Sequence, residues 1–390
     1  MSRYRLQPSP AQERILLRHC SDARYVWNLA VEQHRWWCPG RKSAPGYLEQ
    51  CRQLTAARGE NLWLAEASQT VQQQALRDFD QAMRNFFGGS HRRPSWRKAG
   101  RDEGFRIVAV KPGHVRRLNR KAAQVWVPKA GWVRFRLSRP VPAGVKSFRV
   151  TRDRAGRWHV AFALVPAPVE GPGTGDVVGV DRGVAVTLAL SDGTTYRAPE
   201  PKDTRVLARE LSRAQRGSSR RGKAKLALAR ARVRNADSLR DWAHKTSTGI
   251  ARSYDVIRVE DLRIRNMTRS ARGTIQEPGR NVAAKAALNR SVLQQGWGQF
   301  ARCLEYKAPD RVQKINPAYT SQRCSECGHV DADSRKSQAL FACTACGYCG
   351  NADVNAARNI AAGHAVKARG GDRTVGPANR EPQHELLLVS

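Results

Sequence analysis

Hydrophobic residues recur at helical spacing in two stretches of the first hundred residues. One stretch begins at residue 11 and the other covers residues 68–87, where the apolar side chains fall on one side of the expected helix. The ten residues before them have the pattern of a short strand that ends at two prolines. The pattern therefore predicts a strand followed by a small, mostly helical module.

From about residue 105 the chain alternates between apolar and polar positions. This alternation continues to about residue 163 and is interrupted by glycines at 131, 144 and 156, where turns are expected. Short strands of this kind bury one face and expose the other. We therefore predict a sheet or a β-barrel of several short strands.

Two apolar runs further along the chain end in an acid. The run at residues 177–180 ends at Asp181, and the run at residues 256–259 ends at Glu260. A carboxylate among apolar neighbours is costly to bury, so Asp181 is expected to face a functional site. Asp261 follows Glu260 directly, and because neighbouring strand residues point to opposite faces, only one of the two can share that site.

A third acid, Asp353, opens the helical segment ADVNAARNI. Two acids on neighbouring strand ends and one on a helix packed against the same sheet can converge on a pair of divalent cations, Mg²⁺ or Mn²⁺. Such an acidic cluster needs a cation because close carboxylates repel one another. One bound cation would activate a water molecule while the other stabilises the departing 3′ oxygen, so hydrolysis of a phosphodiester is the expected reaction.

The balance of charges points to nucleic acid as the partner. The chain has 390 residues, with 69 Lys and Arg against 33 Asp and Glu, a formal net charge of +36. A surface this basic attracts polyanions and gains affinity from phosphate contacts. A membrane is the weaker alternative, because the charge is spread along the chain and no apolar run approaches the length of a spanning segment.

Three basic segments are candidates for nucleic-acid contacts. They are the connector HRRPSWRK at residues 91–98, the predicted strands near residues 129–136, and a predicted helical hairpin at residues 204–248 that is broken near residues 217–222. A solvated cationic surface is the alternative for each of them. The candidate contact residues are Arg92, Arg93, Trp96, Lys129, Arg134, Arg136, Arg213, Arg220, Arg221 and Arg230.

Two Cys-x-x-Cys pairs predict a structural zinc site. Cys324 and Cys327 are separated from Cys343 and Cys346 by a spacer whose length is typical of a zinc ribbon, and each pair is followed by Gly. Unrelated or disulfide-bonded cysteines are the alternative. Cys349 could replace Cys346 as the fourth ligand, but symmetry with Cys327 favours Cys346.

No apolar core of a secretory signal follows the start MSRYRLQPSP, and the cysteine pattern favours a reducing compartment. We therefore expect a cytoplasmic protein. Four of the other cysteines are expected to be ordinary buried thiols; they are Cys20, Cys38, Cys51 and Cys303.

Several motifs resemble those of the TnpB family, the RuvC-like RNA-guided nucleases of IS200/IS605/IS607-type insertion sequences, long called transposases and related to type V CRISPR effectors. The matching motifs are GVDRG with Asp181, VEDLRIRNM with Glu260, the knuckles CSECG and CTACG, and NADVNAARNI with Asp353, and the last three in chain order are specific. Weaker matches are YRLQPSPAQ, FFGGSHRRPSW, VPKAGWVRFR and LNRSVLQQGWGQF. The resemblance covers residues 1 to about 360.

The resemblance implies an α+β multidomain protein with an RNase H-like (RuvC) α/β nuclease core. The nuclease would comprise residues 176–322 and 350–363, with a zinc ribbon inserted at residues 323–349. A wedge-type β-barrel would comprise residues 1–10 and 104–175. Residues 11–103 would form the helical recognition module, and residues 364–390 a loose tail.

The resemblance also implies an activity and its partners. The protein would cleave double-stranded DNA beside a short motif that it reads itself, guided by a transposon-derived RNA, with Asp181, Glu260 and Asp353 as the catalytic metal ligands. It would act in the prokaryotic cytoplasm, at the nucleoid, with a monomer favoured. Two alternatives stay open: a transposase that acts on transposon ends without RNA, and a guided DNA-binding repressor that does not cut.

Overall fold

The computed structural model of the protein describes residues 2–36, 40, 44–101, 103–164 and 166–363. It divides into two compact units, Met1–Ala167 with Glu200–Ser238, and Pro168–Pro199 with Leu239–Ser390. The predicted tail at residues 364–390 and Cys38 lie outside the described residues. Among the described helices, none has both the length and the apolarity needed to cross a bilayer.

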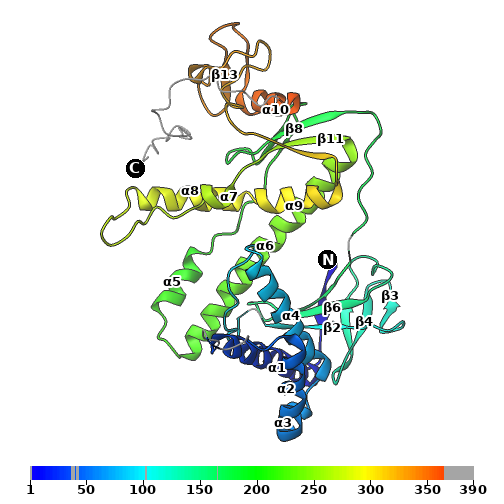
Figure 1. Ribbon diagram of the computed structural model, residues 1–390. Helices are drawn as coiled ribbons and strands as arrows, with labels where there is room; N and C mark the ends of the chain where they lie inside the picture. Colours follow the sequence, from blue (N-terminus) through cyan, green and yellow to red (C-terminus); the bar gives the residue numbers. More distant parts are fainter. Residues whose placement is uncertain (1, 37–39, 41–43, 102, 165, 364–390) are drawn as a thin grey trace. The chain divides into compact units, whose positions relative to one another are not determined.

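The helical part of the first unit follows the predicted pattern and adds to it. The long helix α1 begins after a capping box, in which Ser9 Oγ accepts from Gln12 N at 3.3 Å and Gln12 Oε1 accepts from Ser9 N at 3.0 Å. Helices α1 and α4 lie side by side (Figure 1), and the ring of Trp27 meets that of Phe79 edge-on. The helices are α1 (Pro10–Arg35), α2 (Tyr47–Glu60), α3 (Leu62–Ala65) and α4 (Gln69–Phe87).

The strands of the first unit form one seven-stranded antiparallel sheet in the order β2-β6-β7-β1-β5-β4-β3. The N-terminal strand β1 pairs with β7 on one side and β5 on the other. Its side chains Tyr4 and Leu6 join those of α1 and α4 in one hydrophobic core. No ladder joins the edge strands β2 and β3 among the described residues, so the closed barrel stays a prediction. The strands are β1 (Ser2–Gln7), β2 (Gly104–Val108), β3 (Val115–Asn119), β4 (Ala122–Val127), β5 (Gly131–Arg136), β6 (Ser147–Arg152) and β7 (Trp158–Phe162).

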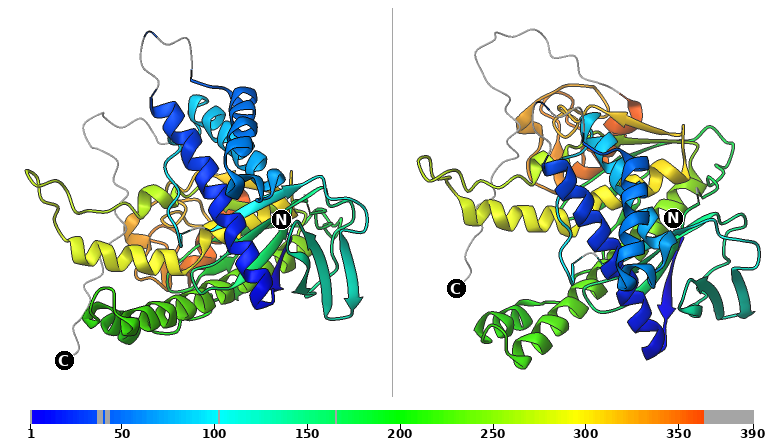
Figure 2. Two further views of the ribbon diagram at one scale, coloured as in Figure 1. Left: turned by 90° about the horizontal axis from the view of Figure 1, so that it is seen from below. Right: turned by 60° about the horizontal axis from the view of Figure 1, so that its bottom comes forward.

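The predicted basic hairpin consists of α5 (Arg205–Arg213) and α6 (Ser219–Ser253). Arg221 closes it by donating to the carbonyl oxygens of Leu211 at 2.8 Å and Ala214 at 2.7 Å, and the two helices lie side by side in Figure 2. Residues 200–238 were placed in the nuclease core from the sequence, but they group with the first unit. One reason is the ion pair of Arg157 Nη2 with Asp237 Oδ2 at 2.8 Å.

The second unit is built on a five-stranded mixed sheet in the order β10-β9-β8-β11-β12. Strands β8, β11 and β12 are parallel to one another, while β9 is antiparallel to β8 and β10 to β9. Such a sheet agrees with the α/β core predicted from the sequence. The strands are β8 (Val177–Asp181), β9 (Leu188–Leu190), β10 (Thr195–Tyr196), β11 (Val256–Glu260) and β12 (Val312–Ile315).

The other elements of the second unit include the predicted ribbon, residues 323–349, which is called the cysteine ribbon below. Helix α10 (orange-red in Figure 1) lies against β8 and β11. Buried side chains of α9, including Phe300 and Leu304, complete the core of the central strands. The elements are α7 (Ile264–Met267), α8 (Val282–Gln294), α9 (Trp297–Lys307), η1 (Ala332–Ser334), β13 (Leu340–Ala342), β14 (Cys349–Asn351) and α10 (Ala352–Ala362).

Candidate active site and metal centre

Asp181 and Glu260 stand at the carboxyl ends of two neighbouring parallel strands. Val180 of β8 is paired with Val259 of β11, so the acids that follow these valines lie at the same edge of the sheet. Glu260 is buried, whereas Asp261 is exposed and its N–H donates to Ile315 O at 2.8 Å. The prediction that only one of these two consecutive acids can share the site with Asp181 agrees with this arrangement.

Helix α10 brings Asp353 towards the same edge. Its N-cap residue Asn351 accepts from the N–H groups of Asp353 and Val354, each at 3.0 Å. The helix lies directly on β8 at Gly179, where an added Cβ would be 2.0 Å from Ala357 O. At the first turn of α10, Asp353 Oδ2 would be 4.0 Å from a Cβ added at Gly183, two residues after Asp181.

The three carboxylates influence one another electrostatically. Burial raises the pKa of Asp181 well above its usual value, and the charges of Glu260 and Asp353 raise it further. Burial also raises the pKa of Asp353. Among the described residues, however, these three acids are not a group whose ligand atoms all lie within 4.8 Å of one another. The structure thus brings the three acids to one edge of the sheet, but their carboxylate oxygens do not all lie within that distance of one another.

Two arginines that the sequence analysis did not single out border the acidic cluster. Arg335, in the cysteine ribbon, donates from Nη2 to Asp353 Oδ1 at 3.2 Å, and its charge lowers the pKa of Asp353 and Asp181 against the effect of burial. Arg182 is buried and donates to the carbonyl oxygen of Glu260. In the sequence, only the position of Arg182 directly after Asp181 indicated that it lies at this site.

A threonine fixes the side chain of Glu260. Thr320 is 3% exposed, and its hydroxyl lies 3.0 Å from Glu260 Oε1 and 3.1 Å from Pro317 O. Asn359 of α10 donates to Thr320 O at 3.0 Å and to Arg323 O at 2.7 Å. The segment between β12 and the cysteine ribbon is therefore held against both Glu260 and α10.

The four predicted zinc ligands lie together. The Sγ atoms of Cys324, Cys327, Cys343 and Cys346 are all within 4.8 Å of one another. Cys324 Sγ is 3.7 Å from Cys346 Sγ, and Cys327 Sγ is 3.6 Å from Cys343 Sγ. Tetrahedral zinc with Zn–S bonds of about 2.3 Å requires sulfurs about 3.8 Å apart, so the donor set fits Zn²⁺.

The backbone repeats the same turn in both knuckles of the cysteine ribbon. Gly328 N donates to Cys324 O at 3.0 Å, and Gly347 N donates to Cys343 O at 3.2 Å. Both glycines have a positive φ, 77° and 73°, which glycine adopts without strain. Cys349 lies outside the cluster, in β14 opposite Ala342, so the geometry favours Cys346 as the fourth ligand.

All ten residues proposed for nucleic-acid contacts lie in the first unit. Nine of them are exposed, whereas Arg221 is half-buried and occupied in closing the α5–α6 hairpin. Arg93 donates to His34 O at 3.1 Å, and the guanidinium of Arg35 lies 5.8 Å from the ring centre of Trp96. The basic connector is thus attached to the end of α1 and keeps its polar groups at the surface.

Three family models match separate parts of the chain. Residues 297–360, which include the cysteine ribbon and Asp353, match the "Cas12f1-like, TNB domain". Residues 159–271, which include Asp181 and Glu260, match the "Probable transposase" model OrfB_IS605. Residues 2–42 match a model described as a helix-turn-helix domain. In the described part of that range the structure has strand β1 and one long helix, α1.

Two curated relatives match over all or nearly all of the chain, and a third matches a short segment. The "Putative RNA-guided DNA endonuclease InsQ" of Escherichia coli strain K12 is 37% identical over 100% of this chain and 98% of its own length. A "Putative RNA-guided DNA endonuclease" of Streptomyces pristinaespiralis is 30% identical over 94% of this chain and 90% of its own length. The Cas12f1 endodeoxyribonuclease of Sulfoacidibacillus thermotolerans is 63% identical over 59 residues, which are 14% of each chain.

A solved structure shows the same architecture. The match is to the "Cryo-EM structure of the Cas12f1-sgRNA-target DNA complex", with a TM-score of 0.57 and 14% identity, over 90% of this chain and 83% of that chain. The fold and the site thus define a class of multidomain proteins that share the fold of Cas12f1, and in this chain a four-cysteine ribbon lies beside an acidic α/β core. Within that class, the chain belongs to the TnpB family, as its full-length identity to InsQ shows.

Proposed function

We propose that this protein is an RNA-guided DNA endonuclease that hydrolyses phosphodiester bonds of double-stranded DNA. The observation that carries the proposal is the electrostatic coupling of Asp181, Glu260 and Asp353 at one edge of the sheet. The chain that contains them is 37% identical over its full length to a relative named an RNA-guided DNA endonuclease. The RuvC-like mechanism, the metal and the guide are parts of this proposal.

The acidic cluster is suited to hold Mg²⁺ or Mn²⁺. Its carboxylates are oxygen ligands, and the pKa of Asp181 is raised first by burial and then by the negative charges of Glu260 and Asp353, which a cation would compensate. When bound, such ions supply an activated water molecule and stabilise the departing 3′ oxygen. Thr320 orients the side chain of Glu260 in this site, and the first turn of α10 positions Asp353.

Arg335 supplies a positive charge beside the acidic cluster. Its side chain is 24% exposed, and its guanidinium contacts Asp353 through a single nitrogen. A guanidinium has five N–H donors, so donors remain for an oxygen of the scissile phosphate. We propose that Arg335 stabilises the negative charge that develops on that phosphate during hydrolysis.

The guide and the target are expected to lie along the basic first unit. Pairing with a transposon-derived RNA would select the DNA sequence, while the protein contacts backbones and reads a short adjacent motif. The net charge of +36 supports this division of tasks, because phosphate contacts are independent of sequence. Zn²⁺ on the four cysteines would stabilise the ribbon that carries Arg335.

The test compares Glu260→Ala with Asp261→Ala in the complex purified with its RNA. Glu260 belongs to the acidic cluster, whereas the neighbouring Asp261 is exposed, so the two variants remove the same charge one residue apart. We expect Glu260→Ala, like Asp181→Ala, to abolish metal-dependent cleavage and keep RNA binding within a few fold. Asp261→Ala should still cut. Unchanged cleavage by Glu260→Ala would contradict the assigned site.

RNA sequencing of the purified complex tests the guide. A defined transcript from the transposon is expected, with cleavage of a matching target in Mg²⁺. Strand joining at transposon ends without RNA would instead identify a transposase. Guided binding with no cleavage in either Mg²⁺ or Mn²⁺ would identify a repressor.

A further inference from the structure

A cavity of about 870 Å³ lies in the first unit beside strands β3 and β4. Its lining comes from two stretches, residues 110–123 and 137–146. Val110 N donates to Lys146 O at 3.2 Å, and Leu137 N donates to Lys121 O at 2.9 Å. These hydrogen bonds tie the two stretches together at both ends, so the cavity has a fixed frame.

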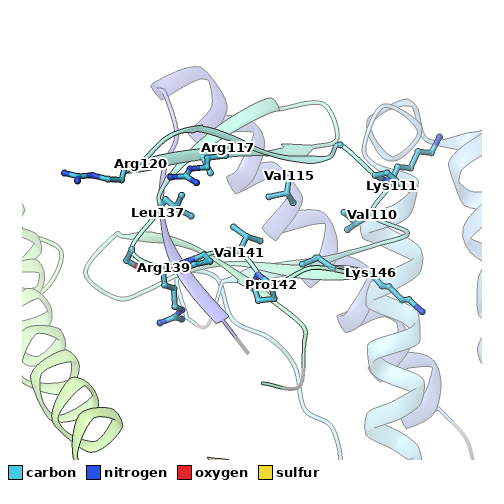
Figure 3. Close-up of a pocket in the computed structure, with 17 residues that line it drawn as sticks. Val110, Lys111, Val115, Arg117, Arg120, Leu137, Arg139, Val141, Pro142 and Lys146 are labelled. Carbon is cyan, nitrogen blue, oxygen red and sulfur yellow. The ribbon is translucent and has the colours of Figure 1, made fainter. Parts of the chain in front are cut away.

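The lining is apolar in the middle and cationic at its ends. Figure 3 shows Val115, Leu137 and Val141 between the two stretches, with arginines gathered at one end and lysines at the other. No carboxylate lines the cavity in the part of the chain that the structure describes. The cations are Arg117, Arg120 and Arg139 at one end, and Lys111 and Lys146 at the other.

Two of the arginines are held in place by the protein. The Arg139 guanidinium lies 5.2 Å from the ring centre of Tyr4 and donates from Nη2 to Arg3 O at 3.3 Å. Arg117 Nε donates to Asn119 O at 3.2 Å. These bonds use few of the five N–H donors of each guanidinium, so both remain able to bind an anion.

We propose that this cavity binds one unpaired nucleotide of the guide RNA. The base would lie against the apolar middle, and the phosphates before and after it would meet the cations at the two ends. Proteins that recognise single-stranded RNA commonly hold unstacked bases against aromatic rings or arginine guanidiniums. No aromatic ring of the described residues lines this cavity, so the arginines and the apolar side chains would take that part. The volume falls within the range of about 300–1,000 Å³ usual for ligand pockets.

The lining also favours RNA over DNA. Ser138 is the only uncharged polar side chain among the described residues that line the cavity, and it is exposed. Its hydroxyl can both donate to and accept from a ribose 2′-hydroxyl, the group that DNA lacks. This inference rests on the proposed function, because it takes the guide RNA as the source of the nucleotide.

Affinity measurements with the purified guide RNA separate the apolar contact from the ionic one. Val141→Trp fills the middle of the cavity, and we expect it to weaken binding about tenfold or more without changing the salt dependence. Arg120→Ala should instead reduce the slope of log K against log salt by about one. Lys121→Ala is the matched control, since it removes a neighbouring exposed cation that does not line the cavity.

A photocrosslinking side chain at Val141 gives a readout that does not depend on affinity. In the protein–RNA complex without DNA, we expect crosslinks to one position in an unpaired part of the RNA, mapped by reverse-transcription stops. Crosslinks spread over paired stems, or no crosslink to the RNA, would overturn the inference, and so would crosslinks to DNA in place of RNA once the target DNA is added. So would guide affinity unchanged by Val141→Trp. If the wild-type protein binds no RNA at all, the proposed function itself fails.

Discussion

The hydroxyl of Thr320 lies 3.0 Å from Oε1 of Glu260, and both residues are buried. Thr320 belongs to the segment between β12 and the cysteine ribbon, and its carbonyl oxygen accepts a hydrogen bond from Asn359 of α10. The same helix carries Asp353 in its first turn. The orientation of Glu260 therefore depends on the contacts that attach α10 to the β12–ribbon segment.

Replacing Thr320 tests this dependence. Thr320→Val keeps the shape of the side chain but removes the hydroxyl, so Glu260 loses a partner that orients it. Loss of such outer contacts typically lowers metal affinity or activity by about 10- to 100-fold. We expect slower DNA cleavage and a higher Mg²⁺ concentration for half-maximal rate, measured on the guide complex, with RNA binding unchanged.

Thr320→Ser is the control for this prediction, because it restores the hydroxyl. Recovery of both the rate and the Mg²⁺ dependence in Thr320→Ser would assign the effect to the hydrogen bond with Glu260. An equal loss in the Ser and Val variants would show that Thr320 acts through packing alone.

Arg335 is expected to stabilise the charge of the reacting phosphate and not to contribute to metal binding. Its guanidinium contacts Asp353 and opposes the rise in the pKa of that carboxyl. Arg335→Ala should slow cleavage about a hundredfold if the guanidinium stabilises the charge of the reacting phosphate. The Mg²⁺ concentration for half-maximal rate should not rise, because removing a cation beside carboxylates does not disfavour another cation.

Lys336→Ala is the matched control for Arg335→Ala. Lys336 is the next residue in the cysteine ribbon and is exposed, so its loss removes one positive charge without touching the acidic cluster. Cleavage kinetics over a Mg²⁺ titration compare the two variants. A similar loss of rate in both would point to general attraction of nucleic acid.

The sequence could predict the strands that carry the acids because buried parallel strands are continuous apolar runs. The run that ends at Glu260 became β11, Val256–Glu260, and Asp353 lies in the first turn of a helix, as its motif indicates. Helix α2 was missed because only Gln50 and Leu54 are buried among its 14 residues, so it has almost no apolar stripe.

The contacts around the acids could not be predicted in this way. Arg335 lies 18 residues before Asp353 in the chain, and Thr320 lies 60 residues after Glu260. Their proximity depends on how the cysteine ribbon and α10 fold back on the sheet, and neither residue belongs to a periodic pattern. The cavity beside β3 is likewise made by two stretches that meet only in the folded sheet.

The packing of α10 on β8 should depend on Gly179. A Cβ there would lie 2.0 Å from Ala357 O and 2.4 Å from Ala361 N, both of which are backbone atoms that can move only with the helix. Gly179→Ala should destabilise the second unit by about 1–3 kcal/mol, as overpacking of a close contact does. Thermal unfolding of the purified protein measures the change.

Gly249→Ala is the control in the same unit, and its effect on stability should have the opposite sign. Gly249 lies in α6 and is exposed, and apart from its chain neighbours and the backbone of its own helix nothing would lie within 4 Å of an added Cβ. Alanine there should raise stability by about 0.5–1 kcal/mol through its higher helix propensity. If Gly179→Ala were as stable as Gly249→Ala, the close crossing of α10 and β8 would be wrong.

The cysteine ribbon should bind one zinc ion through Cys346 and not through Cys349. Cys346→Ser is expected to lower the zinc content of the purified protein and its melting temperature, because binding of structural zinc is coupled to folding. Cys349→Ser should keep both at the wild-type level, since Cys349 lies outside the cluster of sulfur atoms. Metal analysis by mass spectrometry and thermal melting check this, and loss of zinc in Cys349→Ser alone would reverse the assignment.

Asp22 should make the stability of the protein depend on pH. This residue of α1 is 3% exposed, its Oδ2 has no hydrogen-bond partner among the described residues, and burial raises its pKa to about 6. Because the folded state holds the proton more tightly than the unfolded chain, the carboxyl is most destabilising above pH 6. This cost disappears as the pH falls towards 3.8, the ordinary pKa of an aspartate.

Asp22→Asn should therefore stabilise the protein at neutral pH, because the amide has the same shape but carries no charge. The difference between a pKa of about 6 and the ordinary value of 3.8 corresponds to at most about 3 kcal/mol. We expect the melting temperature of Asp22→Asn to exceed that of the wild type by a constant gap well above pH 6, and this gap to narrow as the pH falls below about 6. Asp80→Asn, which removes an ion pair with Arg84 on the surface of α4, should change stability by less than about 1 kcal/mol. A gap for Asp22→Asn that is independent of pH would show that its carboxyl is not the titrating group.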